Sequence, residues 1–262
     1  MLAAERHAKI LGEVHGRGAV RVAELAQILD VSEMTVRRDL DTLAREGKLD
    51  KVHGGATRRS TSTEEPGFEA KSLRQPAEKE AIAAAAAELV TPGSAVGLSA
   101  GTTTWSLAHR LREVGDLTVV TNSMRVADVL HAGHSSGQNV VLTGGVRTPS
   151  DALVGPIAVS ALGQLHLDAV FLGVHGMDEI AGFTTPNLLE ADTDRALVAA
   201  GRRLVVLADH TKWATVGIST IAALEDADVV ITDEHLPEEA QKVLREKVAD
   251  VRLVRPGPER PS

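Results

Sequence analysis

Apolar positions in the first fifty residues recur with the spacing of short α-helices. One stripe follows Ala3, and a second lies in "VAELAQILD" at residues 22–30. The two stripes consist of Ile10, Leu11 and Val14 and of Leu25, Ile28 and Leu29. Because residues at i, i+3, i+4 and i+7 share one face of a helix, each stripe predicts an amphipathic helix with that face buried.

A third helix is predicted directly after a short turn. Val36, Leu40 and Leu43 lie at i, i+4 and i+7 and therefore share its buried face. Ser32 is a suitable N-cap for this helix, and Gly47 is well placed as its stop. Two short helices, a tight turn and a third helix predict a helix-turn-helix, whose last helix can enter the major groove of DNA.

The outer face of the third helix carries arginine. At about 100° per residue, Arg38 and Arg45 point away from the buried face, where Arg can reach guanine edges or phosphates. After Gly47, "KLDKVHGGA" predicts a short basic hairpin, which would form a wing near the DNA backbone. A solvated helix face would also explain the arginines, but the ordered set of cap, helices, glycine stop and basic hairpin favours DNA. The candidate DNA-binding residues are Ser32, Met34, Thr35, Arg37, Arg38, Lys48, Lys51 and His53.

The rest of the chain has a different pattern, in which short runs rich in Val, Leu and Ile alternate with amphipathic helices. The runs are "SAVGLSA", "LTVVTN", "NVVLTGG", "DAVFLGVHG", "RLVVLADH", "DVVITD" and "VRLVRP". This alternation predicts a Rossmann-like α/β domain with a mostly parallel sheet covered by helices. We expect a winged helix-turn-helix domain over residues 1–57, a polar linker or extended strap over 58–76, the α/β domain over 77–255 and a flexible tail over 256–262.

Polar and glycine-rich segments follow several of the predicted strands. Open parallel sheets bind ligands beyond the carboxyl ends of their strands, and here these ends read "SAGTTT", "TNS", "GG", "HGMD" and "ADHTK". Gly101 would let the backbone approach an anion, the threonines at 102–104 would add donors at a helix start, and Lys212 would supply a positive charge. Each segment by itself could be a simple turn or cap, and neither glycine-rich nucleotide motif is present. Their succession favours one anion site.

Composition and charge limit the kinds of partner that the chain is expected to bind. The net charge is −8, but residues 1–60 hold eleven Lys and Arg against nine Asp and Glu, and the rest holds seventeen against twenty-seven. A net positive charge on residues 1–60 and a net negative charge on the rest are consistent with a polyanion bound by the N-terminal segment. The chain has no cysteine, no signal-peptide pattern and no long apolar run, so we expect a cytoplasmic protein. His131 and His134 lack a third ligand nearby, so no metal or other cofactor is expected.

Several motifs resemble one family. "ERHAKIL", "VAELAQILDVSEMTVRRDLDTLAREGKL" and "VHGGA" look like the N-terminal domain of DeoR-type bacterial regulators of sugar metabolism, and "GTTT", "VVTNS", "LVVLADHTKW" and "DVVITD" look like their C-terminal sensor domain. The resemblance implies an operator-binding protein, usually a repressor, and a sensor domain similar in fold to ribose-5-phosphate isomerase that binds a phosphorylated sugar or related metabolite. We also expect a homo-oligomer, a dimer or tetramer, that places two heads on a repeated or palindromic operator.

The resemblance also implies which residues line the effector pocket, and the strand ends add three more candidates. The effector-binding candidates are Ser99, Gly101, Thr102, Thr103, Thr104, Thr121, Asn122, Gly144, Gly145, His175, Asp178 and Lys212. Two positions depart from the family pattern: His175 stands where an acidic or small polar residue is common, and Asp194 where a basic residue is common.

An enzyme of the same fold is the alternative. Sugar-phosphate isomerisation needs a carboxylate base, and isomerases of this fold carry Asp-Gly-Ala-Asp where this chain has His175-Gly176-Met177-Asp178. Only one of the two acids remains, and no nucleophile elbow is present, so we expect no catalytic residues. A purely structural or protein-binding module would leave the polar strand ends unexplained.

Overall fold

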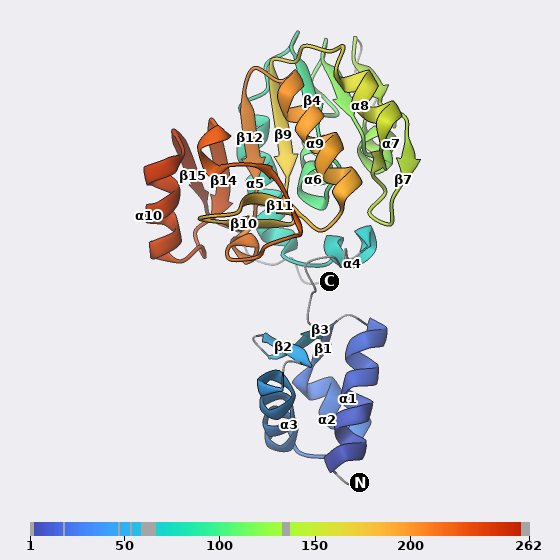
Figure 1. Cartoon of the computed structure of the whole chain (residues 1–262), viewed down its shortest axis with the longest axis vertical. Helices are drawn as coiled ribbons and strands as arrows, with labels where there is room; N and C mark the ends of the chain where they lie inside the picture. The colour runs from blue at the N-terminus through green and yellow to red at the C-terminus, as the bar shows by residue number, and fades with distance from the viewer. Residues whose placement is uncertain are drawn as a thin grey trace. The chain divides into compact units, whose positions relative to one another are not determined.

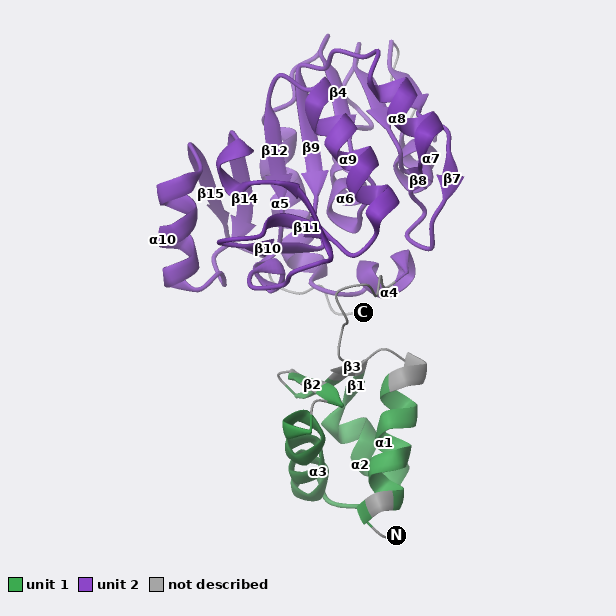
Figure 2. Cartoon of the chain, in the orientation of Figure 1, with its two compact units in different colours: residues 1–61 green, residues 62–262 purple. Residues whose placement is uncertain are grey.

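The computed structural model describes residues 3–17, 19–46, 48–52, 54–58, 67–132 and 137–257. The chain divides into two compact units, residues 1–61 and 62–262, which Figure 2 shows in different colours. The sequence predicted this boundary between residues 57 and 58. In the structure it lies slightly later, because the last strand of the first unit extends to Arg58. Most of the predicted tail lies outside the described residues.

The first unit combines three helices with a small antiparallel sheet (Figure 1). Its elements are α1 (Ala3–Arg17), β1 (Ala19–Arg21), α2 (Val22–Leu29), α3 (Glu33–Arg45), β2 (Leu49–Val52) and β3 (Gly55–Arg58). The sheet has the strand order β1-β3-β2, so the predicted hairpin is confirmed as a wing, and β1 is an addition to it. At Gly55 a Cβ atom would lie 2.2 Å from the carbonyl oxygen of Val20, so only glycine fits where β3 crosses β1.

The three predicted apolar stripes form the core of this unit, with one exception. Ile10, Val14, Leu25 and the α3 stripe are buried together. Ile28 is 42% exposed, so its assignment to the buried stripe of α2 was wrong. Leu29, the neighbouring residue, occupies the core position instead.

The second unit is built on a seven-stranded parallel sheet. Its strands are β4 (Ala95–Leu98), β5 (Thr118–Thr121), β6 (Asn139–Leu142), β9 (Ala169–Gly173), β12 (Leu204–Leu207), β14 (Val229–Asp233) and β15 (Asp250–Val254). They are ordered β15-β14-β12-β9-β4-β5-β6, and every neighbouring pair is parallel. All seven apolar runs identified in the sequence therefore lie in one sheet, which confirms the predicted α/β architecture.

Helices cover both faces of this sheet (Figure 1). They are α5 (Pro76–Ala87), α6 (Thr102–Leu111), α7 (Met124–His131), α8 (Pro156–Leu162), α9 (Leu188–Ala200) and α10 (Glu238–Lys247). One core cluster joins α8, α9 and α10 to the sheet, and the other joins α5, α6 and α7 to it. Val170 and Leu172 belong to the first cluster and Phe171 to the second, because successive side chains of a strand point to opposite faces.

Shorter elements complete the second unit. They are α4 (Phe68–Ser72), the pair β7 (Val146–Arg147) and β8 (Leu153–Val154), the small antiparallel sheet of β10 (Gly176–Asp178), β11 (Gly182–Thr185) and β13 (Ser219–Ala222), and the 3₁₀ turns η1 (His210–Lys212) and η2 (Leu224–Asp226). Two predictions from the sequence differ from these observed elements. "HGMD" is mainly strand β10, not an open loop, and the segment predicted as linker contains α4. None of the helices in the described ranges is long and apolar enough to cross a membrane.

Candidate functional site

The start of helix α3 is closed by the predicted N-cap. The Oγ atom of Ser32 accepts a hydrogen bond from the backbone amide of Thr35 (3.2 Å), and the two hydroxyls lie 2.9 Å apart. This capping leaves the first turn of the helix regular and its outer face exposed. Met34, next to the cap, is 68% exposed.

The arginines of α3 differ in their partners. Arg37 forms an exposed ion pair with Glu33 (3.1 Å), and the guanidinium of Arg45 donates to the carbonyl oxygen of Asp41 (3.3 Å). Arg38 is exposed, and its guanidinium has no hydrogen bond or ion pair to any residue that the structure describes. It is therefore the arginine of this helix that has no partner among the described residues.

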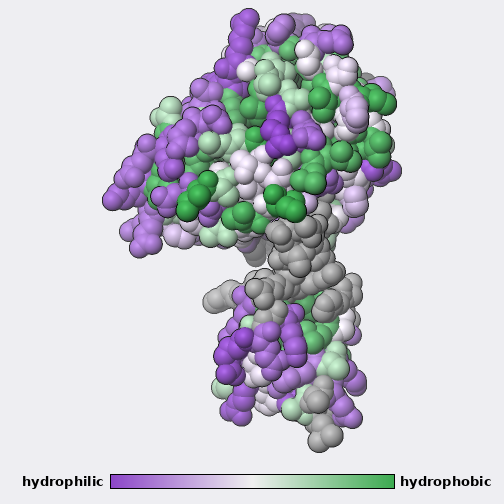
Figure 3. Space-filling view, in the orientation of Figure 1, coloured by the Kyte–Doolittle hydropathy of each residue, from purple (hydrophilic) through white to green (hydrophobic). Residues whose placement is uncertain are grey.

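An open hollow marks the outer face of α3. It is lined by Arg38, Asp41, Ala44 and Arg45, and Figure 3 shows hydrophilic residues over this surface. The wing adds Lys51, which pairs with Asp41 at 2.5 Å, and Lys48, which pairs with Glu46 at 2.7 Å. Exposed pairs of this kind contribute about 0–1 kcal/mol, so DNA phosphates can replace the carboxylates. His53 lies outside the described residues.

An internal ion pair fixes the position of α3. The Arg6 guanidinium of α1 donates to both carboxylate oxygens of Asp39, at 2.7 and 3.0 Å, and the His7 ring lies 3.1 Å from the same carboxylate. Burial alone would raise the pKa of Asp39, but the hydrogen bonds and charges of Arg6 and His7 outweigh it and hold this pKa below its usual value. Asp39 is therefore a buried anchor on the helix that carries Arg38.

In the second unit, the predicted strand ends meet at one edge of the sheet. The seven strands are parallel, so β4, β5, β9 and β12 present their carboxyl ends together. The Oγ atom of Ser99 accepts from the amide of Gly173 (2.9 Å), which joins the ends of β4 and β9. The side chain of Asn122 accepts from the amide of Ala100 (2.9 Å), which joins β4 to β5. Thr121 donates to the carbonyl of Leu98 (2.7 Å). These candidates hold the edge together.

The Gly-Thr-Thr-Thr segment opens helix α6, with Gly101 as its N-cap. The Thr104 hydroxyl donates to the carbonyl oxygen of Gly101 (3.0 Å), so this threonine closes the turn. Within the described part of the chain, the hydroxyls of Thr102 and Thr103 have no hydrogen-bond partner. The first turn of a helix also leaves backbone amides without acceptors. Thr102 and Thr103 therefore remain available to an anion.

The remaining candidates on this edge have local roles. Gly144 and Gly145 have φ angles of +73° and +120°, and a Cβ on Gly145 would lie 2.6 Å from the carbonyl oxygen of Val154. The Asp178 carboxylate accepts hydrogen bonds from the amides of Ile180 and Ala181, both at 2.9 Å, and so closes the β10–β11 turn. These contacts explain three of the candidate residues by structure alone.

The two positions that depart from the family pattern lie on different elements. His175 precedes β10, is half-buried and donates its backbone amide to the carbonyl of Thr184 (3.2 Å). Asp194 is 8% exposed on α9. One turn earlier, the Glu190 carboxylate accepts hydrogen bonds from Thr148 (2.9 Å) and Ser150 (2.5 Å).

Basic side chains gather beside η1. Lys212 is half-buried, and burial lowers the pKa of its ammonium; Asp209 opposes this shift, whereas Lys71 and Arg74 add to it. Neither Lys212 nor Arg74 has a side-chain hydrogen bond or ion pair to another described residue. Two basic side chains without a partner among the described residues therefore lie beside η1, where an anion could pair with them.

Sequence reasoning missed a further lysine in this group. Lys79 is 4% exposed, and its Nζ donates to the carbonyl oxygens of Lys71 (2.5 Å) and Arg74. Burial lowers the pKa of Lys79 to about 8, Asp209 opposes this, and Lys212 adds to it. The signal was a lysine on the apolar stripe of α5, three residues before Ile82.

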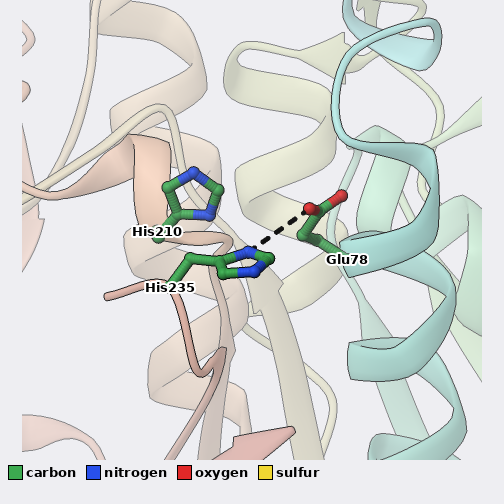
Figure 4. A group of neighbouring side chains, drawn as sticks. All are labelled: Glu78, His210 and His235. Carbon is green, nitrogen blue, oxygen red and sulfur yellow. Dashed lines mark ion pairs between the residues drawn. The ribbon is translucent and has the colours of Figure 1, made fainter. Parts of the chain in front are cut away.

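One group in the described part of the chain has the spacing of a metal site, and it consists of Glu78, His210 and His235 (Figure 4). These residues are far apart in the sequence, and none of them was predicted from the sequence as a metal ligand. The sequence offered His131 and His134 as a possible metal-binding pair. His131 is not part of this group, and His134 lies outside the described residues.

Comparison with known proteins identifies both units. The model of the DeoR-like helix-turn-helix domain matches residues 6–62, and that of the DeoR C-terminal sensor domain matches residues 74–234. The chain is 35% identical over 255 residues to the uncharacterized HTH-type transcriptional regulator YulB of Bacillus subtilis, covering 97% of this chain and 98% of that protein. It is 31% identical over 249 residues to the HTH-type transcriptional repressor CsqR of Escherichia coli K12, covering 95% and 94%.

Among solved structures, a D-ribose-5-phosphate isomerase in complex with phospho-erythronic acid has a TM-score of 0.39 and 15% identity, covering 52% of this chain and 53% of that one. The family models and the relatives cover nearly all of the sequence. The chain belongs to the DeoR family of DNA-binding transcriptional regulators.

Proposed function

We propose that this regulator is a repressor of a carbohydrate-metabolism operon, and that a phosphorylated sugar or related anionic metabolite at the carboxyl edge of the sheet modulates its operator binding. The observation that carries the proposal is the unpartnered pair of hydroxyls at the start of α6, on the same sheet edge as the basic group around Lys212. The match to a domain described as a sensor supports it.

The sheet order sets the span of such a ligand. β4, which leads to Thr103, and β12, which leads to Lys212, are both neighbours of β9. Strands lie about 4.8 Å apart, so the two strand ends are separated by about 10 Å. One ligand can therefore place an anionic group at the start of α6 and a second polar group toward Lys212, or the reverse.

Helix α4 is the element through which binding would reach the linker. Phe68 of α4 packs edge-to-face on Trp105 of α6, with ring centroids 5.7 Å apart. Trp105 directly follows the threonine segment, and α4 directly follows the residues that lead from the DNA-binding unit. A ligand that binds one arrangement of α4 more tightly than another shifts the balance between them, whereas equal binding shifts nothing.

The regulator is expected to act as a homo-oligomer, so that two α3 helices meet two operator half-sites. The surface of the second unit supports association, because large apolar side chains are exposed there (Figure 3). Those at least 45% exposed are Leu73, Val146, Ile157, Ile180, Leu188, Leu189, Val216 and Ile218. Apolar surface rimmed by polar residues is typical of protein interfaces.

A thermal-shift screen of phosphorylated sugars on the full chain, followed by gel shifts with its own promoter region, tests the proposal. A ligand at 100 times its Kd should stabilise the second unit by about 2.7 kcal/mol and change operator binding. Thr103→Ala and Lys212→Met should keep DNA binding and lose the response. Lys242→Met, an exposed lysine on α10, is the control and should keep both. A full response in Thr103→Ala and Lys212→Met would refute the site.

The isomerase-like alternative gains no support from the geometry. Its remaining acid, Asp178, already accepts two backbone amides in a hairpin turn. Turnover of ribose 5-phosphate that is abolished in Asp178→Asn would favour the enzyme.

A further inference from the structure

Three loops and helix ends bring histidine and carboxylate groups together at the edge of the sheet. Glu78 lies in the first turn of α5, His210 in η1 after β12, and His235 in the turn after β14. One ligand atom from each lies within 4.8 Å of the others. Figure 4 shows the two imidazole rings and the glutamate converging, with the His235–Glu78 ion pair dashed.

The buried carboxylate of Asp233 lies beside the two histidines and contacts both of them, but it is not one of the three converging groups. Its Oδ1 atom lies 2.8 Å from Nδ1 of His210 and 3.3 Å from Nδ1 of His235. The Nδ1 atom of His235 is also 3.6 Å from Oε1 of Glu78. Asp233 is fully buried.

The spacing of these three groups suits one cation. Tetrahedral zinc has ligands at about 2.0–2.1 Å, so neighbouring ligand atoms are about 3.3 Å apart. The His235 Nδ1 and Glu78 Oε1 atoms are 3.6 Å apart, and one ligand atom from each of the three residues lies within 4.8 Å of the others. Two imidazoles and one carboxylate form an N/O ligand set that suits a first-row transition metal better than Mg²⁺ or Ca²⁺, which prefer oxygen ligands only.

The backbone holds the set in place before any ion arrives. The amide of His210 donates to Oδ2 of Asp233 (2.8 Å), and the amide of His235 donates to Oδ1 (3.1 Å). Because both histidine backbones are fixed to the same carboxylate, their rings need little reorganisation to share a ligand. Such preorganisation distinguishes a metal site from a chance cluster of surface charges.

We infer that Glu78, His210 and His235 form a binding site for a divalent transition-metal ion of the zinc type, with Asp233 holding the two histidines, and that the ion joins the start of α5 to the ends of β12 and β14. Each imidazole binds the ion through the lone pair of one ring nitrogen, so a proton on that nitrogen moves to the other ring nitrogen or to solvent. The inference is independent of the effector, since the site can be filled with metal alone.

The test uses full-length, tag-free protein that has been stripped with a chelator and titrated with ZnCl₂ by calorimetry, with the bound metal counted by mass spectrometry. We expect one tight site per chain and a rise in melting temperature with Zn²⁺ but not with Mg²⁺. His235→Ala, at an exposed position, should weaken zinc binding at least tenfold, and Glu78→Gln should do the same while preserving side-chain shape. His131→Ala, an exposed histidine on α7, is the matched control and should bind like the wild type.

Zinc binding that is equal in His235→Ala, Glu78→Gln and wild type would overturn the site. The absence of a tight site in the wild type would overturn it as well. If His235→Ala fails to fold, Glu78→Gln decides the question by itself.

Discussion

The buried ion pair between α1 and α3 allows a prediction about the stability of the DNA-binding unit. Arg6→Met keeps most of the apolar stem but removes two hydrogen bonds to Asp39, whose side chain is 8% exposed. Breaking a buried pair from one side costs about 3–5 kcal/mol. His7 remains at 3.1 Å as a partial partner, so we expect a loss of about 2–4 kcal/mol.

That loss is large for a unit of this size. Near 60 °C, unfolding entropy is about 2.1 cal/mol/K per residue, so 1 kcal/mol lowers the melting temperature of a unit of about 60 residues by about 8 °C. Arg6→Met should therefore lower the melting of the first unit by about 15–30 °C. Calorimetry of the full chain would show this as an earlier first transition, and gel shifts at 37 °C would show lost operator binding.

Two further variants decide whether the buried charge is the cause. Arg37→Met breaks an exposed ion pair on the same helix and should cost less than about 0.5 kcal/mol. The double variant Arg6→Met/Asp39→Leu removes both charges and should recover most of the loss, because an apolar replacement of a buried pair is often neutral. The buried charge is not the cause if Arg6→Met costs no more than Arg37→Met, or if the double variant is less stable than Arg6→Met alone.

Three other predictions concern DNA binding, backbone geometry and pH. Arg38→Ala should weaken operator binding by about 1–3 kcal/mol at fixed salt, and more than Arg37→Ala, because only Arg38 is free; fluorescence anisotropy would measure both, and equal losses would contradict the assignment. Gly145→Ala should destabilise the second unit by about 1–3 kcal/mol, because φ is +120° and the new Cβ would meet a carbonyl oxygen at 2.6 Å; an unchanged melting temperature would contradict this. The hydrogen bond from Arg125 lowers the pKa of Asp151 below 3.8, so this carboxylate stabilises the fold above that pH and the contribution is lost as pH falls through the lower folded value. Asp151→Asn should lower the melting temperature at pH 7, with a difference from wild type that shrinks as the pH falls below 3.8.

The sequence predicts the large sheet well for a physical reason. Parallel strands are buried on both faces and read as continuous apolar runs, and all seven such runs are strands of one sheet. The short antiparallel strands give no such signal. β11 is buried throughout but reads "GFTT", and β1 has only three residues.

The site was predictable at the level of the sheet edge but not of the individual side chain. Parallel topology brings the strand ends together, so Ser99 and Asn122, which the sequence suggested, do lie at that edge. Whether a hydroxyl is free or engaged depends on contacts that spacing does not encode, which separates Thr103 from Thr104. The sequence did contain one indication that was overlooked, which is a charged residue on the apolar stripe of a predicted helix. Asp39 follows Val36 by three residues, and Lys79 precedes Ile82 by three, so both are buried and both hold a neighbouring segment in place.

The contacts that hold α4 are too weak to make a complete switch by themselves. Phe68 on Trp105 is worth about 0.5–1.5 kcal/mol beyond its buried area. The Arg125 guanidinium lies 4.9 Å from the Phe68 ring centroid, which adds about 0.5–1 kcal/mol, and its ion pair with Glu69 at 2.8 Å adds about 0–1 kcal/mol. Together these contacts amount to about 1–4 kcal/mol, whereas moving a two-state balance from 1:99 to 99:1 needs about 5.5 kcal/mol of differential binding. Release of α4 by itself would therefore shift operator occupancy only in part. A complete switch also needs the basic group behind α4, where Lys79 holds the carbonyls of Lys71 and Arg74, to change with the ligand.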